Sequence, residues 1–233
     1  MAPAPPKALA PPKASTGAFA FATFATLIAG FVDAVGYAHL GGLFLSFMSG
    51  NTTRLGIALG QQHWAMAGQA VTVIASFVFG AFLGTLLSMR AGSWKLVLIL
   101  AVEVALFALA TGLVLLDAGF AALLPVAVGM GLQNSVHQVV GGADIGKSFV
   151  TGALFGMGQA LAKCLAGTAK HEEWLAYAAS WGSFVAGAMT GAIALGGFGL
   201  TTAMGAACVL LLVLTIIALV AHRHLAMRAP VTG

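Results

Sequence analysis

Residues 76–84, SFVFGAFLG, return as residues 183–191, SFVAGAMTG, with six of nine positions identical. Three further landmarks return in the same order: GFVDAV at 30–35 as GLQNSV at 131–136, Gly41-Gly42 as Gly141-Gly142, and SFMSG at 46–50 as SFVTG at 148–152. Chance matching of apolar residues explains one such echo, but explains four in order poorly. The chain therefore repeats itself at a distance of about one hundred residues.

The composition predicts an integral membrane protein. The chain has 233 residues, of which 60% are hydrophobic and 7% are charged, whereas soluble domains carry about 25% charged residues. The net charge of +4 follows from the basic loops of a membrane protein, so nucleic acid is not an expected partner. Cys164 and Cys208 lie in apolar context and predict neither a disulfide nor a zinc site. No cofactor and no metal are predicted.

Six segments meet the length of about 20 mainly apolar residues that a membrane-crossing helix needs: 18–38, 66–88, 95–117, 119–140, 173–195 and 199–221. Two glycine-interrupted segments, 41–61 and 141–168, are either two further spans or two re-entrant segments. Cytoplasmic loops collect Lys and Arg, and six spans with a cytoplasmic N-terminus put nine of the ten basic residues on the cytoplasmic side. We therefore expect six spans and two re-entrant segments.

Each half of the chain would then hold three spans, and an odd number of spans forces the two halves into opposite orientations. The expected fold is all-α, with six transmembrane helices in a 3+3 inverted repeat. Repeat 1 covers about 18–117 and repeat 2 about 119–221, each with a broken, re-entrant helix segment. A single transmembrane domain, 18–222, would follow a disordered Pro/Ala-rich cytoplasmic tail, 1–17, and precede a cytoplasmic tail, 223–233.

The polar stretch SFMSGNTTRLG, residues 46–56, is the candidate substrate site. We expect Gly50 to break the helix, so that two half-helices meet inside the membrane. The second half-helix would offer N–H groups, hydroxyls and a positive charge to an anionic or polar solute. The predicted binding residues here are Ser49, Gly50, Asn51, Thr52, Thr53 and Arg54.

The second half would contribute fewer polar groups to this site. Thr151-Gly152 is expected to make the same break, but Ala153 and its apolar neighbours replace the Asn-Thr-Thr-Arg run. Gln133, Asn134 and His137 add polar groups from the end of the fourth span. The small-residue stripes Ser76/Gly80/Gly84 and Ser183/Gly187/Gly191 are better explained by close helix contacts than by a ligand.

Asp33 lies inside the first span, whereas its repeat mate, Asn134, is neutral. A salt bridge between Asp33 and Arg54 that only holds the fold is one interpretation. Proton coupling, in which Asp33 binds and releases a proton, is the other, and the sequence does not choose between them. Glu103 is the second acid within a span, and nothing at helical spacing pairs with it.

The stretches GFVDAVGYAHLGGLFLSFMSGNTTRLGIAL, 30–59, and GMGLQNSVHQVVGGADIGKSFVTGALFGMGQAL, 129–161, resemble the YoaK family of bacterial inner-membrane proteins, a domain of unknown function. The resemblance covers nearly the whole chain after residue 17. It implies a multi-pass protein of the bacterial inner membrane, and the basic residues predict that both termini are cytoplasmic. It implies no substrate and no activity.

The leading hypothesis is a small secondary transporter for a small anionic or polar solute, with Asp33 as the titrating residue if transport is proton-coupled. The alternative is a passive channel or facilitator, since re-entrant half-helices are also the logic of aquaporin-type pores, although the Asn-Pro-Ala signature is missing. An enzyme is not expected, because no Gly-x-Ser-x-Gly, His-Glu-x-x-His or phosphate-loop motif occurs. A structural role stays open, and the Gly/Ser faces would allow a homodimer in the bilayer.

Overall fold

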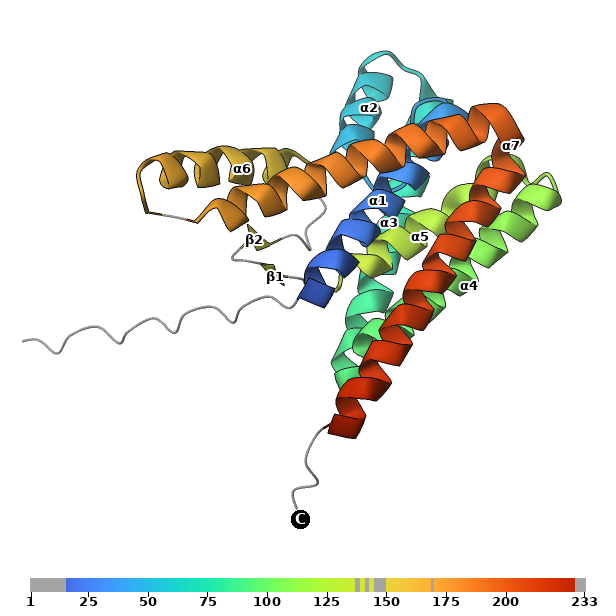
Figure 1. Cartoon of the computed structure of the whole chain (residues 1–233). Coiled ribbons are helices and arrows are strands. Elements are labelled where there is room, and N and C mark those ends of the chain that lie inside the picture. Colours follow the sequence, from blue (N-terminus) through green and yellow to red (C-terminus); the bar gives the residue numbers. More distant parts are fainter. Residues whose placement is uncertain (1–15, 137–138, 141–142, 145–149, 169, 229–233) are drawn as a thin grey trace, which may run out of the picture.

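The computed structural model describes residues 16–136, 139–140, 143–144, 150–168 and 170–228 (Figure 1). The predicted N-terminal tail up to residue 15, His137 and the start of the second re-entrant segment lie outside the described residues. The helices are α1 (Thr16–His39), α2 (Met48–Gly60), α3 (Trp64–Arg90), η1 (Gly92–Trp94), α4 (Lys95–Leu115), η2 (Gly119–Leu123), α5 (Leu124–Gln133), α6 (Val150–Leu165) and α7 (His171–Arg228). Strands β1 (Val139–Val140) and β2 (Ala143–Asp144) form one short antiparallel pair. The predicted all-α class is confirmed.

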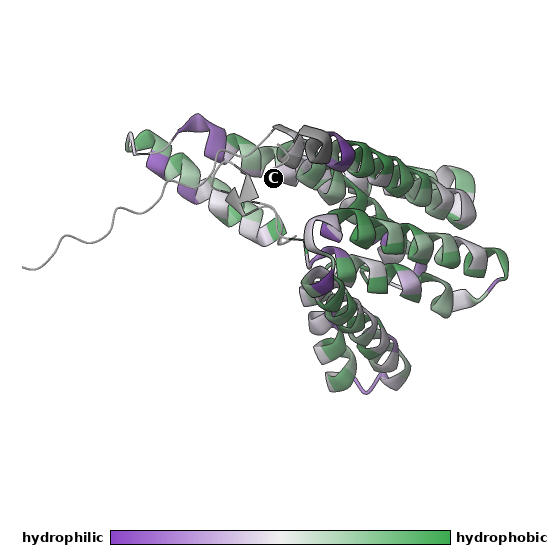
Figure 2. Cartoon of the chain, turned by 90° about the horizontal axis from the view of Figure 1, so that it is seen from below, coloured by the Kyte–Doolittle hydropathy of each residue, from purple (hydrophilic) through white to green (hydrophobic). Residues whose placement is uncertain are grey.

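The surface of the bundle is that of a membrane protein. Four of the described helices are long and apolar enough to cross a bilayer: Phe19–His39, Trp64–Arg90, Gly92–Leu115 and His171–His224. Large apolar side chains such as Val78, Phe82 and Ile193 are more than half exposed in the middle of these helices. Figure 2 shows hydrophobic residues along the helices and hydrophilic residues mainly at their ends and connections. Lipid solvates such a surface and water does not.

The long helix α7 is divided by Gly199. This glycine has φ 80° and ψ 171° inside the helix, a backbone conformation that glycine adopts at little cost. Figure 1 shows α7 turning sharply at the kink, so that it forms a first limb, 171–198, and a second limb, 200–228. The kink falls between the predicted spans 173–195 and 199–221. The helix continues to Arg228, six residues beyond the predicted end of the transmembrane domain at 222.

The fourth predicted span is shorter than expected. The apolar helical segment covers Gly119–Gln133, and the amides of Ser135 and Val136 donate to the carbonyls of Leu132 and Gln133, as in a turn. The prediction that this helix continues to residue 140 was wrong. Val136, Val139 and Val140 extended the predicted span across the polar residues between them, although Val139 and Val140 belong to β1.

A backbone contact joins α1 to the first limb of α7. A Cβ added to Gly30 would overlap the carbonyl of Phe184, and a Cβ added to Gly187 would overlap the carbonyl of Leu27. Gly191 also lies against α1. Such close approach of two helices requires residues without side chains, which is how small-residue stripes act in membranes.

A second crossing, between α5 and α3, is built in the same way. A Cβ added to Gly131 would overlap the carbonyl of Phe77, one added to Gly80 would overlap the carbonyl of Val128, and Gly84 also lies against α5. The α5 residues lie 101 positions after their counterparts in α1, and the α3 residues lie 107 positions before theirs in α7. Each crossing therefore joins a helix of one half to a helix of the other half.

One apolar cluster fills the space around the two crossings. Ile28 and Val32 of α1, Phe107 of α4, Met130 of α5 and Met204 in the second limb of α7 are all fully buried in it. Because helices from both halves supply this cluster, the two halves share a single core. The predicted stripes of small residues thus contact the chain itself, while a homodimer through other Gly/Ser faces stays a prediction.

We expect Gly80→Ala and Gly187→Ala to destabilise the protein by about 1–3 kcal/mol each, because the added methyl group must push two backbones apart. Gly68→Ala and Gly182→Ala are matched controls on the same two helices, since a Cβ at either position meets nothing within 4 Å. Thermal unfolding in detergent measures the difference. Equal melting temperatures for the two pairs of variants would show that the backbones do not touch at these crossings.

Candidate functional site

The irregular segment 40–47, between α1 and α2, is held by a carboxylate from α1. Asp33 is 2% exposed. Its Oδ1 accepts the backbone N–H groups of Leu45 at 2.8 Å and Ser46 at 2.6 Å, and its Oδ2 accepts the Ser46 hydroxyl at 2.7 Å. Bonds this short are typical of an ionised acceptor. A negative charge is also favourable where α2 begins, two residues further on.

Asn51 fixes the same segment from α2. Its side chain is fully buried, its Oδ1 accepts the N–H of Phe44 at 2.8 Å, and its Nδ2 donates to the carbonyl of Phe44 at 2.8 Å. Both sides of the amide are therefore used by one backbone unit. Asn51 and Asp33 together satisfy backbone polar groups that no regular helix satisfies. The predicted contact between Asn51 and a solute stays a prediction.

The predicted break of the helix at Gly50 is wrong. α2 is helical from Met48 to Gly60, so Gly50 lies in its first turn and the chain before Met48 is not helical. Thr52 and Thr53 lie in the second turn, where their hydroxyls donate to the carbonyls four residues earlier. The chain is irregular only before Met48, where Asp33 and Asn51 bind its backbone. A glycine inside a helix costs only about 1 kcal/mol relative to alanine, so the helix passes through Gly50.

The predicted break at Thr151-Gly152 is also absent, since α6 is helical from Val150 to Leu165. Both residues are exposed in the first turn of α6. α6 packs on α7 whereas α2 packs on α3, so the two helices have different main packing partners. Thr151 and Gly152 therefore lie on a helix that packs elsewhere than the helix of Ser49, which is exposed on α2.

Arg54 folds back over the start of the irregular segment. Its Nη2 donates to the carbonyl of Gly41 at 2.8 Å, and its guanidinium lies 5.9 Å from the ring centre of Tyr37. A Cβ added to Gly42, where φ is 95°, would collide with the guanidinium. The Nε of Arg54 is buried and has no hydrogen-bond partner.

The predicted salt bridge between Asp33 and Arg54 does not form in the described part of the chain. The hydrogen bonds of Asp33 come from Leu45 and Ser46, and Arg54 donates to Gly41 instead. Backbone N–H groups of the segment 40–47 occupy the carboxylate of Asp33, so Arg54 donates to the backbone carbonyl of Gly41 instead. Tyr37 and Gly41 were missed in the sequence, because neither residue type distinguishes a cation partner from an ordinary turn.

Gln133, at the end of α5, reaches the acid that has no partner at helical spacing. Its Nε2 donates to the Oε2 of Glu103 in α4 at 3.3 Å. Asn134, the next residue, is half-buried and donates to the carbonyl of Met130 at 2.7 Å. The pair Glu103–Gln133 is separated by 30 residues, so no local spacing could reveal it. The available signal was only that both are polar residues next to long apolar runs.

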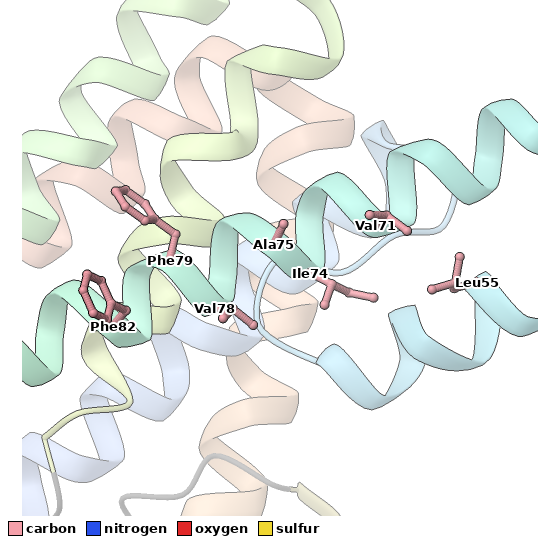
Figure 3. Close-up of a pocket in the computed structure, with 7 residues that line it drawn as sticks. All are labelled: Leu55, Val71, Ile74, Ala75, Val78, Phe79 and Phe82. Atoms are coloured by element: carbon pink, nitrogen blue, oxygen red, sulfur yellow. The ribbon is translucent and has the colours of Figure 1, made fainter.

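An apolar groove of about 540 Å³ runs along the outer face of α3, beside α2 (Figure 3). It is lined by Leu55, Val71, Ile74, Ala75, Val78, Phe79 and Phe82. These side chains offer no hydrogen-bond donor or acceptor. The groove therefore has the chemistry of a surface for acyl chains, and it does not suit the small polar solute that the sequence predicts.

Comparison with known proteins gives a family and no activity. The family model described as "Protein of unknown function (DUF1275)" matches residues 21–217. The UPF0700 transmembrane protein RA0705 of Rhizobium meliloti (strain 1021) is 30% identical over 168 residues, which cover 72% of either chain. The UPF0700 transmembrane protein YoaK of Bacillus subtilis (strain 168) is 29% identical over 137 residues, 55% of this chain and 60% of that one. No solved structure matches. The resemblance to the YoaK family is confirmed.

We expect Asp33→Asn to lower the free energy of unfolding by about 1.5–3 kcal/mol, because the amide lacks the charge that three donors share and turns an NH₂ group toward one of them. Asp117→Asn is the matched control, since Asp117 is exposed in a connection with φ 52°, a conformation that Asn tolerates. Thermal unfolding in detergent compares them. If both variants melt like the wild type, the segment 40–47 is not held by Asp33.

Proposed function

The chain belongs to the DUF1275 family, whose relatives are transmembrane proteins of unknown function, and we propose that it is a small secondary transporter for a small anionic or polar solute. The observation that carries the proposal is the buried Nε of Arg54, which has no acceptor among the described residues. A buried donor left unpaired costs about 1–3 kcal/mol. An oxygen of a bound solute would supply the missing acceptor beside a positive charge.

The helices support six crossings of the membrane. They are α1, α3, α4, the segment of η2 and α5, and the two limbs of α7 on either side of Gly199. Figure 1 shows α1 running from near mid-height up toward α2, and the second limb of α7 running from the kink at the top down to the lower end of the molecule. Together with the positions of the basic residues, this supports cytoplasmic termini in a bacterial inner membrane.

The two matched crossings support a 3+3 inverted repeat. The same residue offsets relate α1 on α7 to α5 on α3, so each half lends its first span to the second span of the other half. Transporters with this architecture place their site at the interface of the repeats and move one repeat against the other. Backbone-to-backbone contacts at glycines suit such motion, because no large side chains interlock there.

Residues 40–47 and α2 together support a re-entrant segment. α2 has 13 residues and is shorter than the segment Gly119–Gln133 of the proposed fourth crossing. It is also preceded by irregular chain, whereas η2 leads directly into α5. Asp33 holds the irregular chain about two turns below the end of α1, and Asn51 and the hydroxyls of Thr52 and Thr53 follow in α2. Irregular backbone at such depth occurs where protein or a water-filled cavity satisfies it, which is the setting a polar solute needs.

A solute that binds only the folded protein should raise its melting temperature, by the equivalent of about 2.7 kcal/mol at about 100 times the dissociation constant. We expect at least one small anion or polar solute to do so with the wild type and with Arg90→Gln, and to lose the effect with Arg54→Gln. Arg90, in the last turn of α3, is the control for a general effect of positive charge. Detergent-solubilised protein and a panel of inorganic anions, carboxylates, sugars and amino acids provide the measurement.

Uptake of the stabilising solute into proteoliposomes then separates the transporter from the channel. Accumulation above the external concentration in an imposed pH gradient supports coupled transport, whereas simple equilibration supports the facilitator. If no solute stabilises the wild type, or if Arg54→Gln responds equally, the site at Arg54 is not a solute site.

The six-span topology is tested by cysteine labelling in cells, with Cys164 and Cys208 replaced by Ser and Ala. Gln62→Cys and Asp117→Cys should react with a membrane-impermeant maleimide from outside, because both connections would face the periplasm. Ser93→Cys, in η1, should react only after the membrane is permeabilised. Reaction of Ser93→Cys in intact cells would contradict the proposed orientation.

A further inference from the structure

The two acids inside the candidate spans are treated differently by the fold. Asp33 accepts three hydrogen bonds of 2.6–2.8 Å. Glu103 is 0% exposed, accepts one hydrogen bond at 3.3 Å from Gln133, and its Oε1 is buried without any partner. Both carboxylate oxygens of Asp33 thus accept hydrogen bonds, whereas one carboxyl oxygen of Glu103 has no partner among the described residues.

The length of the bond to Gln133 argues against a charged Glu103. N–H···O hydrogen bonds are most often about 2.9–3.0 Å long, and an ionised acceptor shortens them further. A buried charge without a partner costs several kcal/mol even after the surroundings relax. A neutral carboxylic acid avoids this cost, and its carbonyl oxygen still accepts from the amide of Gln133.

No described cation lies where it could neutralise Glu103. α5 and η2 contain no titratable residue, and Gly129 of α5 lies so close that an added Cβ would be 3.4 Å from the Cγ of Glu103. The second limb of α7 brings the thiol of Cys208, which donates to the carbonyl of Val104 at 3.8 Å. The basic residues of α3, α4 and the second limb of α7 are in their end turns: Arg90, Lys95, His222, Arg223, His224 and Arg228.

We propose that Glu103 binds a proton in this conformation, and that the Glu103–Gln133 pair is the site of the coupling ion. The coupling role rests on the transporter function proposed above, whereas proton binding does not. The proton comes from water and forms an O–H bond on the carboxyl group, and the same bond breaks when the proton returns to water. Asp33 remains ionised as the fixed cap of the segment 40–47 and carries no proton.

A polar end of α5 connects this site to the surface. Gln133, Asn134 and Ser135 are half-buried, and the hydroxyl of Ser88 in the last turns of α3 donates to that of Ser135 at 3.4 Å. Glu103 lies eight residues from the start of α4, about 12 Å along the helix. The proton therefore exchanges with water from the end of the bundle where α3 ends and α4 begins, while the amide of Gln133 orients the carboxyl group and carries no proton.

Infrared spectroscopy of the purified protein tests the proposal, because a neutral carboxylic acid has a carbonyl band that shifts in heavy water and that carboxylates lack. At neutral pH we expect this band in the wild type, Asp33→Asn and Asp117→Asn, and its loss in Glu103→Gln. Absence of the band from the wild type, or its survival in Glu103→Gln and loss in Asp33→Asn, would overturn the assignment.

Two further measurements distinguish the ion and the role. Glu103→Gln mimics the neutral acid, so we expect it to melt close to the wild type, whereas Glu103→Ala leaves a cavity and melts earlier. Stabilisation of the wild type by sodium chloride over choline chloride, lost in Glu103→Gln, would show a metal cation in place of the proton. Absence of transport with the band intact would overturn the transporter and leave the proton site standing.

Discussion

Buried backbone that is not helical must have its N–H groups satisfied by the protein, and this constraint organises the segment 40–47. Residues 40–47 meet it through two side chains, the carboxylate of Asp33 in α1 and the amide of Asn51 in α2. Because these residues belong to the two flanking helices, they also set the angle at which α2 leaves α1. The position of Arg54 over Gly41 follows from that angle.

The all-α class, the membrane location and the family could be predicted from the sequence, because composition and the length of apolar runs report directly on the solvent around a helix. Local boundaries were less accessible. A glycine inside a polar stretch suggested a break at Gly50, but the irregular chain lies before Met48, where it is held by Asp33, 13 residues before Ser46. A contact supplied by another helix leaves no local pattern. The end of α5 at Gln133 was missed because Val136, Val139 and Val140 extended the predicted span across the polar residues between them.

The sequence correctly indicated that the glycine stripes make helix contacts, but it did not indicate which helices they contact. Sequence similarity relates Gly80 to Gly187, and only the fold shows that each touches a helix of the opposite half. The same limit applies to the candidate site. A salt bridge between Asp33 and Arg54 was one interpretation of their opposite charges, yet backbone N–H groups occupy the carboxylate instead. Charge alone predicts attraction, whereas the competing neutral donors depend on how the chain turns.

Both acids within the candidate spans, Asp33 and Glu103, belong to the first half, and the second half offers neutral side chains at the corresponding helix end. Asn134 corresponds in the repeat to Asp33, so an amide stands there in place of a second carboxylate. Its neighbour Gln133 donates a hydrogen bond to Glu103. The two halves thus share the pattern of helix crossings but differ in the charge of the corresponding side chain. In the proposed transporter, a bound proton would favour an arrangement that buries Glu103 against α5 as a neutral acid over one that does not, by the difference in the free energy of proton binding.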